Sequence, residues 1–371
     1  YRAHPILSLS ILVMALGDAA AAVVGEGLAS PNIYYLSSDK KSVEGSLTMF
    51  AVTVTVLVAG LTWFGYVEEH SLGFVVVVSI VAALNATAWE ALSSRGLDNL
   101  TVPLSTALVL AVYLLADSAE AGEQFTVGTV LGLFIGAVSY RVGFLSLSGT
   151  VATFLLASIV YGLGGWQWTT PILVFFLASS LLSKMGTAHK ERLRDVFEKG
   201  SRRDHLQVFA NGGIAGLLAV AAWVFPEADL YPLYLGCVAA VTADTWGTEV
   251  GVLTKRRTYL VTTWRPVSPG VNGGVSLAGL SGAFLGAALI ASVGFCWKPD
   301  PFLAALVALA GFLGGVADSV AGATLQASYR CPVCGKVTEK REHCRRGPSE
   351  GPQPAVPQLV RGLRWMGNDA A

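Results

Sequence analysis

Uninterrupted apolar segments follow one another along almost the whole chain, each near the length of about 20 residues with which a helix spans a bilayer. Eleven such segments occur, at 5–24, 46–65, 71–93, 100–116, 125–140, 149–164, 169–184, 207–225, 230–249, 276–296 and 302–323. A twelfth would begin near Val360. The segments lack the alternation of a barrel strand, so they predict helices. We expect an all-α polytopic membrane protein with about 11–12 transmembrane helices.

Composition and charge support this class and orient the helices. The chain is 53% hydrophobic and 13% charged, with a mean hydropathy of +0.58, whereas soluble domains carry about 25% charged residues. If the loop at 25–45 is cytoplasmic, only Arg2 and Lys298 of the 25 Lys and Arg lie on the opposite side. This is the positive-inside pattern. We therefore expect a protein of the cell inner membrane or its equivalent, with its polar motifs on the cytoplasmic face.

Four acids lie near the inner ends of these apolar segments: Asp18, Glu90, Asp244 and Asp318. Ionisable residues inside a membrane segment are costly and usually functional, so these four are the candidate catalytic residues. Carboxylates are also the ligands that Mg²⁺ prefers. The candidate magnesium ligands are Asp18, Asp98, Asp244, Glu249 and Asp318.

The acids belong to a pattern that occurs twice, which predicts an internal repeat. Each copy runs from an acid through a polar loop to a glycine, and then through an apolar hairpin to a second acid. These positions are Asp18, Gly45 and Glu90 in the first copy, and Asp244, Gly274 and Asp318 in the second. We expect two related modules, at residues 1–118 and 119–371.

Cations adjoin the acids in both modules. Lys40 and Lys41 precede Glu44 in the first, and Lys255 and Arg256 follow the acids of the second. Acids and cations together suit an anionic substrate bridged by a divalent metal, since carboxylates bind the metal and cations hold phosphate oxygens. A basic inner face also follows from topology alone, and for any single cation that alternative stays open.

Two glycine-containing stretches predict anion binding through the backbone. Asn211 begins an Asn-Gly-Gly run that we expect to open a helix, whose free N–H groups attract anions. The loop at 268–276 contains Gly273, Gly274 and Ser276, a candidate cradle for phosphate. Close helix packing in the first case and a tight re-entry turn in the second are the structural alternatives.

A cysteine cluster near the end of the chain predicts a metal site of another kind. Cys331, Cys334, His343 and Cys344 offer three sulfurs and one nitrogen, the ligand set of a zinc knuckle. A C-x-x-C pair on a cytoplasmic face favours metal over a disulfide. Four protein ligands leave no open position, so the zinc would be structural.

Several motifs in fixed order resemble known membrane enzymes. GDAAAAVVG, KKSVEGS and LDNLTVPL in the first module resemble the dolichol kinase and phytol kinase family, which is similar to the phosphatidate cytidylyltransferases. The second module contains FANGG, ADTWGTEVG, GVNGGVS, ADSVAGATLQ and CPVCG, and it resembles the phytyl-phosphate kinase family. The resemblance covers almost the whole chain. By comparison with those families, the first module lacks a front half and the second stops where its last helix is expected to begin.

The resemblance implies CTP as phosphoryl donor, Mg²⁺ as cofactor, and an isoprenoid alcohol and its monophosphate as acceptors. Two modules would then catalyse two steps, from alcohol to monophosphate and from monophosphate to diphosphate. The first family's nucleotide and metal motifs fall on Asp18, Lys40, Lys41, Glu44, Glu90 and Asp98. The motifs of the second family fall on Asn211, Asp244, Glu249, Asn272, Ser276, Asp318 and Asn368. Membrane lipid is an expected partner, and nucleic acid is not.

Two other classes of function remain open from the residues. A CTP-dependent cytidylyltransferase would use similar acids but release pyrophosphate and leave a CDP-lipid. A lipid or ion transporter also shows repeated modules and acids inside the membrane. The acids here gather near one face rather than at the bilayer midplane, which disfavours transport.

Overall fold

The computed structural model describes residues 3–116, 118–185, 202–253, 257–268, 271–335, 337–338 and 357–365. The chain divides into two compact units, unit 1 at Tyr1–Gly165 and unit 2 at Trp166–Ala371. The division falls inside helix α8 (Leu147–Met185), where Gly165 has φ 60° and ψ −156° and interrupts the helix. The module boundary between residues 118 and 119 concerns sequence relationship rather than packing, and it stays a prediction.

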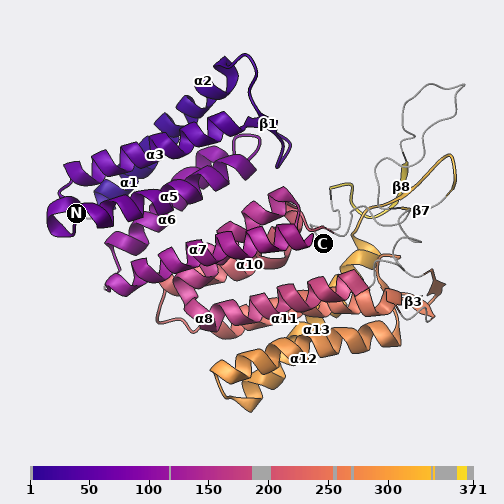
Figure 1. The fold of residues 1–371 in the computed structure, drawn as a ribbon. Coiled ribbons are helices and arrows are strands. Elements are labelled where there is room, and N and C mark those ends of the chain that lie inside the picture. Colours follow the sequence, from indigo (N-terminus) through magenta and orange to yellow (C-terminus); the bar gives the residue numbers. More distant parts are fainter. Residues whose placement is uncertain are drawn as a thin grey trace, which may run out of the picture. The chain divides into compact units, whose positions relative to one another are not determined.

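Unit 1 is a group of apolar helices with one short hairpin (Figure 1). Its helices before α8 are α1 (Ala3–Leu12), the π-helix η1 (Val13–Asp18), α2 (Ala19–Gly27), α3 (Val43–Trp63), α4 (Tyr66–Glu69), α5 (Leu72–Leu92), α6 (Asp98–Leu114) and α7 (Ala119–Val142). The antiparallel strands β1 (Ile33–Tyr34) and β2 (Lys41–Ser42) join α2 to α3. Helix α3 packs against α2 and α5, and α6 packs against α5 and α1. The hairpin thus lies at the end of the packed helices.

Unit 2 contains the second part of α8 and four further long helices. These are α10 (His205–Val224), α11 (Tyr231–Leu253), α12 (Leu277–Trp297) and α13 (Pro301–Thr324). Its strands are β3 (Thr258–Leu260), β4 (Pro266–Val267), β5 (Gly274–Val275), β6 (Ser328–Arg330), β7 (Val337–Thr338) and β8 (Gln358–Arg361). They form two antiparallel three-stranded sheets, in the orders β4-β3-β5 and β7-β6-β8.

Helix α11 is the centre of unit 2 because α10, α12 and α13 all pack against it (Figure 1). Glycines make the contacts close, as is common where helices meet in membranes. A Cβ added to Gly282 or Gly286 of α12 would lie 2.9 or 3.0 Å from a carbonyl oxygen of α11. One added to Gly315 of α13 would lie 3.2 Å from the Asp244 nitrogen. The acid of α11 therefore lies between two tightly packed helices.

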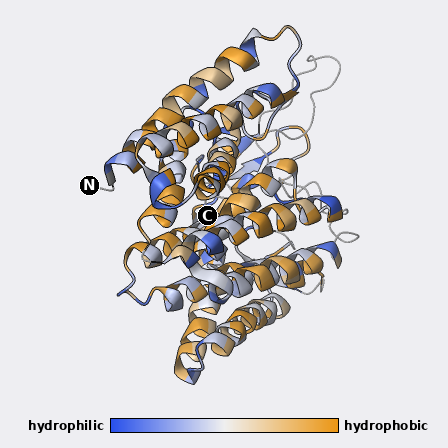
Figure 2. Ribbon diagram, turned by 60° about the vertical axis from the view of Figure 1, so that its left-hand side comes forward, coloured by the Kyte–Doolittle hydropathy of each residue, from blue (hydrophilic) through white to orange (hydrophobic). Residues whose placement is uncertain are grey.

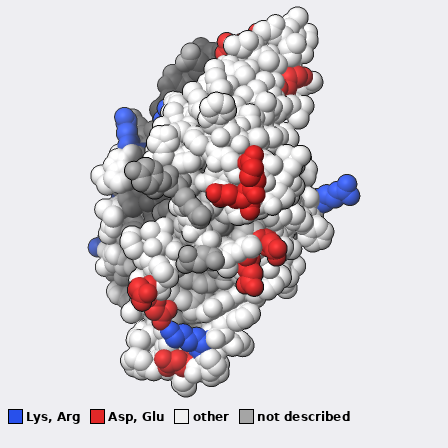
Figure 3. All heavy atoms as spheres, turned by 90° about the vertical axis from the view of Figure 1, so that its left-hand side faces the viewer, with Lys and Arg blue, Asp and Glu red and all other residues white. Residues whose placement is uncertain are grey.

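The prediction of a helical integral membrane protein is confirmed. Among the described residues, eight helices are long and apolar enough to cross a membrane. Their apolar character is visible in Figure 2, and the face in Figure 3 is mostly uncharged. Eight is fewer than the predicted eleven because α8 joins two segments, α6 has 17 residues, and α11, which carries Asp244 and Glu249, is not among the eight.

The prediction of a twelfth helix near Val360 is wrong. Residues Gln358–Arg361 form strand β8, which pairs with β6. The apolar run at this point is only Leu359 and Val360, flanked by Gln358 and Arg361, too short to span a bilayer. The three small sheets also qualify the all-α prediction, because they occupy the connections between the helices.

Candidate functional site

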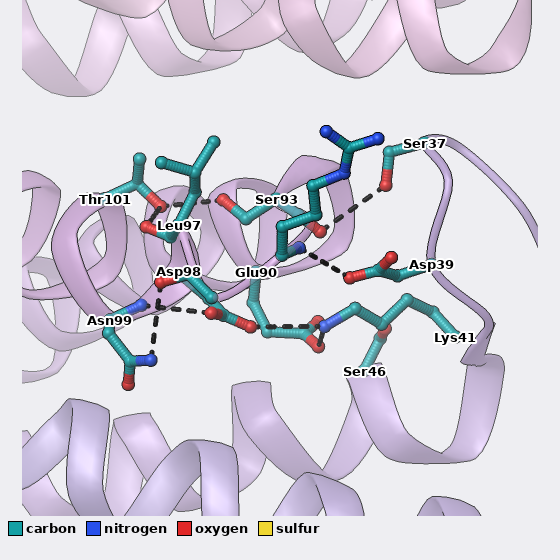
Figure 4. Close-up of polar contacts among 12 residues, drawn as sticks. Ser37, Asp39, Lys41, Ser46, Glu90, Ser93, Leu97, Asp98, Asn99 and Thr101 are labelled. Atoms are coloured by element: carbon teal, nitrogen blue, oxygen red, sulfur yellow. Dashed lines mark hydrogen bonds and ion pairs between the residues drawn. The ribbon is translucent and has the colours of Figure 1, made fainter.

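An acid and lysine cluster lies at the end of the packed helices of unit 1. The Lys41 Nζ atom of β2 lies 2.6 Å from Glu90 Oε1 of α5 and 3.6 Å from Asp98 Oδ2 of α6 (Figure 4). Glu90 is only 4% exposed. Its second oxygen, Oε2, has no hydrogen-bond partner among the described residues. Glu90 is therefore held at one oxygen and available as an acceptor at the other.

Local turns bring these three side chains together. Ser42 caps α3 by accepting a hydrogen bond from the Gly45 N–H at 3.1 Å, which ends the hairpin next to Lys41. Between α5 and α6, Arg95 has φ 56°, and its N–H donates to Asp39 Oδ2 at 2.8 Å (Figure 4). This bond lowers the pKa of Asp39 and ties the hairpin to the turn that positions Asp98.

Opposing effects set the charge of Lys41. Burial lowers the pKa of the Lys41 ammonium group, but the hydrogen bond to Glu90 and the charges of Glu90, Asp98 and Asp18 together raise it above the usual lysine value. Asp18, at the end of the π-helix η1, therefore lies near enough to act on the cluster electrostatically. A π-helical turn is uncommon and is often found at functional sites. In unit 1, Lys41 thus lies among three predicted acids.

In unit 2, the acids Asp244 of α11 and Asp318 of α13 interact directly. Their side chains lie close enough for the charge of Asp318 to act on Asp244, and both residues are half-buried. Two carboxyl groups lie together stably if they share a proton, because two carboxylates repel each other. A divalent cation is the other species that holds two adjacent carboxylates together. This acid pair is the most distinctive polar contact inside the helices of unit 2.

The glycine loop of unit 2 packs against the end of α13. Gly273 has φ 73°, and a Cβ added there would lie 2.3 Å from the Ala323 Cβ. The Arg361 Nη2 atom of β8 donates to the carbonyl oxygens of Asn272 at 3.3 Å and Gly322 at 3.4 Å. Close packing and a positive φ thus account for glycine at 273, as expected for a tight re-entry turn.

Comparisons with known proteins place this arrangement in a family. Residues 130–371 match the model of a family described as integral membrane protein DUF92. The chain belongs to the DUF92 family. The match does not extend over the first module, so the fusion of two modules stays a prediction. No solved structure matches the chain.

Curated proteins add relatives of this DUF92 chain. It is 34% identical to Protein PGR of Arabidopsis thaliana, over 44% of this chain and 65% of the relative. It is 31% identical to the uncharacterized membrane protein MJ0933 of Methanocaldococcus jannaschii, over 39% of this chain and 60% of the relative. It is 39% identical to a phytol kinase of Synechocystis sp., over 28% of this chain and 42% of the relative. The chain thus spans less than two thirds of the length of each.

Within the DUF92 chain, the expectation that Asn211 opens a helix is wrong. Helix α10 begins at His205, capped by Asp204, and Asn211 lies inside it. Asp204 and Gln207 form a reciprocal capping box, in which the Gln207 N–H donates to Asp204 Oδ1 at 3.0 Å. The Asp-x-x-Gln spacing was the stronger sequence signal for the start of this helix. Asn211 therefore has no free helix-end N–H group to offer a phosphate.

The other predicted residues lie at separate places. Glu249 is buried, and its Oε1 accepts a hydrogen bond from Ser183 at 2.6 Å. Lys40 is exposed, whereas Glu44 accepts hydrogen bonds from the backbone and side chain of Asn32. Ser276 caps α12 by accepting from the Gly279 N–H at 3.1 Å. Gly274 lies in β5, where its N–H donates to the Val271 oxygen at 2.9 Å.

The predicted zinc site is only partly described. Cys331 is buried and Cys334 exposed, in the turn between β6 and β7, where the Gly335 N–H donates to the Cys331 oxygen at 2.9 Å. His343 and Cys344 lie outside the described residues, as do Lys255, Arg256 and Asn368. Zinc binding stays a prediction.

The donor sets suit magnesium better than a metal enclosed by protein ligands. Within the described ranges, no group of three or more His, Cys, Asp or Glu is placed to hold an ion. Mg²⁺ is usually bound through one or two carboxylates together with water and substrate phosphates. Asp244 and Asp318 offer such a pair. In unit 1, by contrast, Lys41 already contacts Glu90 and Asp98.

The same glycine contact occurs in both units, at positions other than those that the sequence spacing predicted. A Cβ on Gly25 would lie 2.7 Å from Ser42 Oγ and 3.8 Å from the Gly45 Cα, and one on Gly251 would lie 3.6 Å from both Ser276 Oγ and the Gly279 Cα. Gly25 and Gly251 each follow their unit's acid, Asp18 or Asp244, by seven residues. The structural partner of Gly45 is therefore Gly279, not Gly274. The Ser-x-x-Gly spacing of these caps was the available signal.

Proposed function

We propose that this DUF92 protein is a CTP-dependent kinase of isoprenoid lipids. Unit 1 would phosphorylate a phytol- or polyprenol-type alcohol, and unit 2 would convert the monophosphate to the diphosphate. The active sites would lie on the cytoplasmic face of the cell inner membrane or its equivalent. The support comes from the acid clusters, the motif resemblance and the phytol kinase relative, which matches over part of both chains.

The observation that carries the proposal is the pairing of acids in each unit. Lys41 bridges Glu90 and Asp98 in unit 1, and Asp244 lies close to Asp318 in unit 2. Each set lies on apolar helices and beside a short sheet that leads into a Ser-capped helix. An isoprenoid chain in the bilayer would present its polar head group at the ends of those helices.

Phosphoryl transfer asks a protein mainly to position its reactants and to stabilise charge. In unit 2, Asp244 and Asp318 would hold Mg²⁺, which neutralises charge on the transferring phosphate. In unit 1, the unpartnered Oε2 of Glu90 suits a general base. It would take the proton of the alcohol as the alcohol oxygen bonds to the γ-phosphorus of CTP. The bond from that phosphorus to the bridging oxygen then breaks, and CDP leaves.

The test is to identify the lipid product. Purified protein is incubated with CTP and Mg²⁺, with either phytol or phytyl monophosphate, and the lipids are analysed by mass spectrometry. We expect one added phosphoryl group per step and release of CDP. A CDP-lipid with pyrophosphate would instead identify a cytidylyltransferase. Lipid movement across vesicles without nucleotide consumption would identify a transporter, and either outcome overturns the proposal.

A further inference from the structure

Two helices of unit 2 run side by side in the same direction. The Tyr234 hydroxyl of α11 donates to the Trp168 carbonyl oxygen of α8, and the Ser183 hydroxyl of α8 donates to Glu249 Oε1 of α11 at 2.6 Å. Both bonds join residues 66 positions apart. An equal offset at two points means that α8 and α11 are parallel and in register between them. One face of α8 therefore lies against α11 along this length.

That face of α8 carries two buried hydroxyl groups that bond to nothing in the described part of the chain. Ser179 is 0% exposed and Ser180 is 5% exposed, and neither Oγ atom has a hydrogen-bond partner there. Serines in helices commonly bond to the carbonyl four residues before, as Ser158 does to Phe154 at 2.8 Å. A buried polar group without a partner costs free energy, and a native site with two of them calls for a ligand or water.

A half-buried arginine lies one helical turn away. The Arg203 guanidinium carbon lies 5.5 Å from the ring centre of Phe175 and 5.9 Å from that of Phe176. Ser179 and Ser180 follow these phenylalanines by four residues, so each hydroxyl lies on the same face of α8 as the ring that Arg203 covers.

The charge of Arg203 is not neutralised by an adjacent acid in the described residues. Glu249 acts on Arg203 electrostatically, but no ion pair within 4 Å joins Arg203 to a described carboxylate. Burial lowers the pKa of Arg203 and Glu249 raises it, and a guanidinium stays charged throughout the physiological range. The site thus offers a planar cation and two hydroxyl donors beside apolar rings.

We propose that Arg203, Ser179 and Ser180 bind the phosphate head group of a lipid phosphomonoester. Arginine and hydroxyl donors match phosphate oxygens, and Phe175 and Phe176 provide an apolar wall for the first carbons of the chain. The site lies near the acid pair, since Glu249 is five residues beyond Asp244, or about 7.5 Å of helix. This inference rests on the proposed function, because it makes the site the acceptor pocket for the isoprenyl monophosphate.

The experiment measures binding without turnover. Full-length protein in detergent is dialysed to equilibrium against radiolabelled geranylgeranyl monophosphate in the absence of CTP, with geranylgeraniol, inorganic phosphate and CTP as competitors. We expect Arg203→Gln to weaken binding of the lipid phosphate about tenfold or more, the size of one lost charge-assisted hydrogen bond. The double variant Ser179→Ala/Ser180→Ala should weaken it about threefold to tenfold.

Two matched controls accompany these variants. Arg202→Gln removes the same charge from the exposed neighbouring residue, and Ser158→Ala removes an equally buried hydroxyl that already has a partner. Both should bind the lipid phosphate as the unmodified protein does. If Arg203→Gln fails to fold, the serine pair decides the result, since Ala fits wherever Ser fits in a helix.

The outcomes separate this site from the proposed function. Unchanged lipid phosphate binding in folded Arg203→Gln, or in the serine pair when that variant decides, overturns the site. Loss of CTP binding with lipid phosphate binding intact also overturns it, because the pocket would then hold a nucleotide. If lipid phosphate binding depends on Arg203 yet no diphosphate forms when CTP and Mg²⁺ are added, the site stands and the second kinase step fails.

Discussion

The acid clusters of the two units differ in how their charges are balanced. In unit 1, Glu90 and Asp98 share the ammonium group of Lys41. In unit 2, Asp244 and Asp318 lie close together, and no described cation lies within ion-pair distance of either. The charge of the first cluster is thus partly neutralised by the protein itself. The second needs a proton or a cation from outside, which makes it the stronger candidate for a metal.

Packing explains the difference. Helix α11 touches both α12 and α13 through glycines, so that the acids of α11 and α13 meet side by side. In unit 1 the acids come instead from α5 and the start of α6, and the hairpin places a lysine between them. The same elements in the same order therefore produce two electrostatic environments.

The largest expected effect comes from removing a charge in the acid pair of unit 2. Asp244→Asn keeps the volume of the side chain but removes a predicted metal ligand, so conversion of monophosphate to diphosphate should fall about a thousandfold or more. Asp229→Asn is the control, because Asp229 pairs with Lys298 and lies outside both clusters. The measurement is the initial rate with phytyl monophosphate, CTP and Mg²⁺. Full activity in Asp244→Asn would remove the metal assignment.

Substitutions in the lysine-bridged cluster of unit 1 should change the stability of the protein. Lys41→Met leaves Glu90 and Asp98 without their shared cation, and breaking a largely buried ion pair costs about 3–5 kcal/mol. Lys40→Met, at an exposed residue, should change the free energy of unfolding by less than about 0.5 kcal/mol. Unfolding in mixed micelles measures both. The double variant Lys41→Met/Glu90→Gln should recover most of the loss, and equal stability of Lys41→Met and the unmodified protein would show that the pair stabilises nothing.

The same lysine predicts a pH dependence. Because the pKa of Lys41 is raised in the folded protein, its stabilising contribution is complete below the unfolded lysine value of about 10.4. It is lost as the pH rises through the higher folded value. The free energy of unfolding should therefore fall at strongly alkaline pH, and it should fall less steeply in Lys41→Met. Parallel pH profiles would contradict this.

A smaller effect tests the local repeat common to both units. Gly45→Ala places a Cβ 3.1 Å from the Ala21 oxygen, and Gly279→Ala places one 2.9 Å from the Gly247 oxygen. Each should destabilise the protein by about 1–3 kcal/mol through overpacking. Gly27→Ala and Gly236→Ala are matched controls, because a Cβ there meets nothing within 4 Å. Thermal unfolding of the four variants is compared, and an effect at only one of the two tight glycines would break the correspondence.

Loss of zinc should have the smallest effect on the two acid clusters. If the cysteine cluster holds the metal, purified protein should contain about one equivalent of zinc, and Cys334→Ser should lose it. The acid clusters should keep most of their activity. Cys296→Ser serves as a control, because Cys296 lies in α12, away from the cluster. Protein that is reduced, freshly purified and free of zinc would leave Cys331 and Cys334 without this role.

The helices were predictable because long apolar runs have few structural alternatives in a bilayer. The acids were predictable because an ionisable residue inside such a run is costly and usually functional. What failed were details that depend on capping and on tertiary contact. Asn211 carried a motif, yet Asp204 and Gln207 start the helix. The Lys41 bridge joins residues 49 apart, and no local pattern encodes such a contact. Gly274 looked equivalent to Gly45 by its distance from the acid, although the Ser-x-x-Gly spacing and the packing both identify Gly279 at that position.

The most direct test of two separate sites is to measure both half-reactions in Asp18→Asn and Asp318→Asn. Separate sites predict that Asp18→Asn blocks phosphorylation of the alcohol and leaves conversion of the monophosphate intact. They also predict that Asp318→Asn lets the monophosphate accumulate. Loss of both activities from either substitution would contradict the account, because it would mean that the acids of both units serve one shared site.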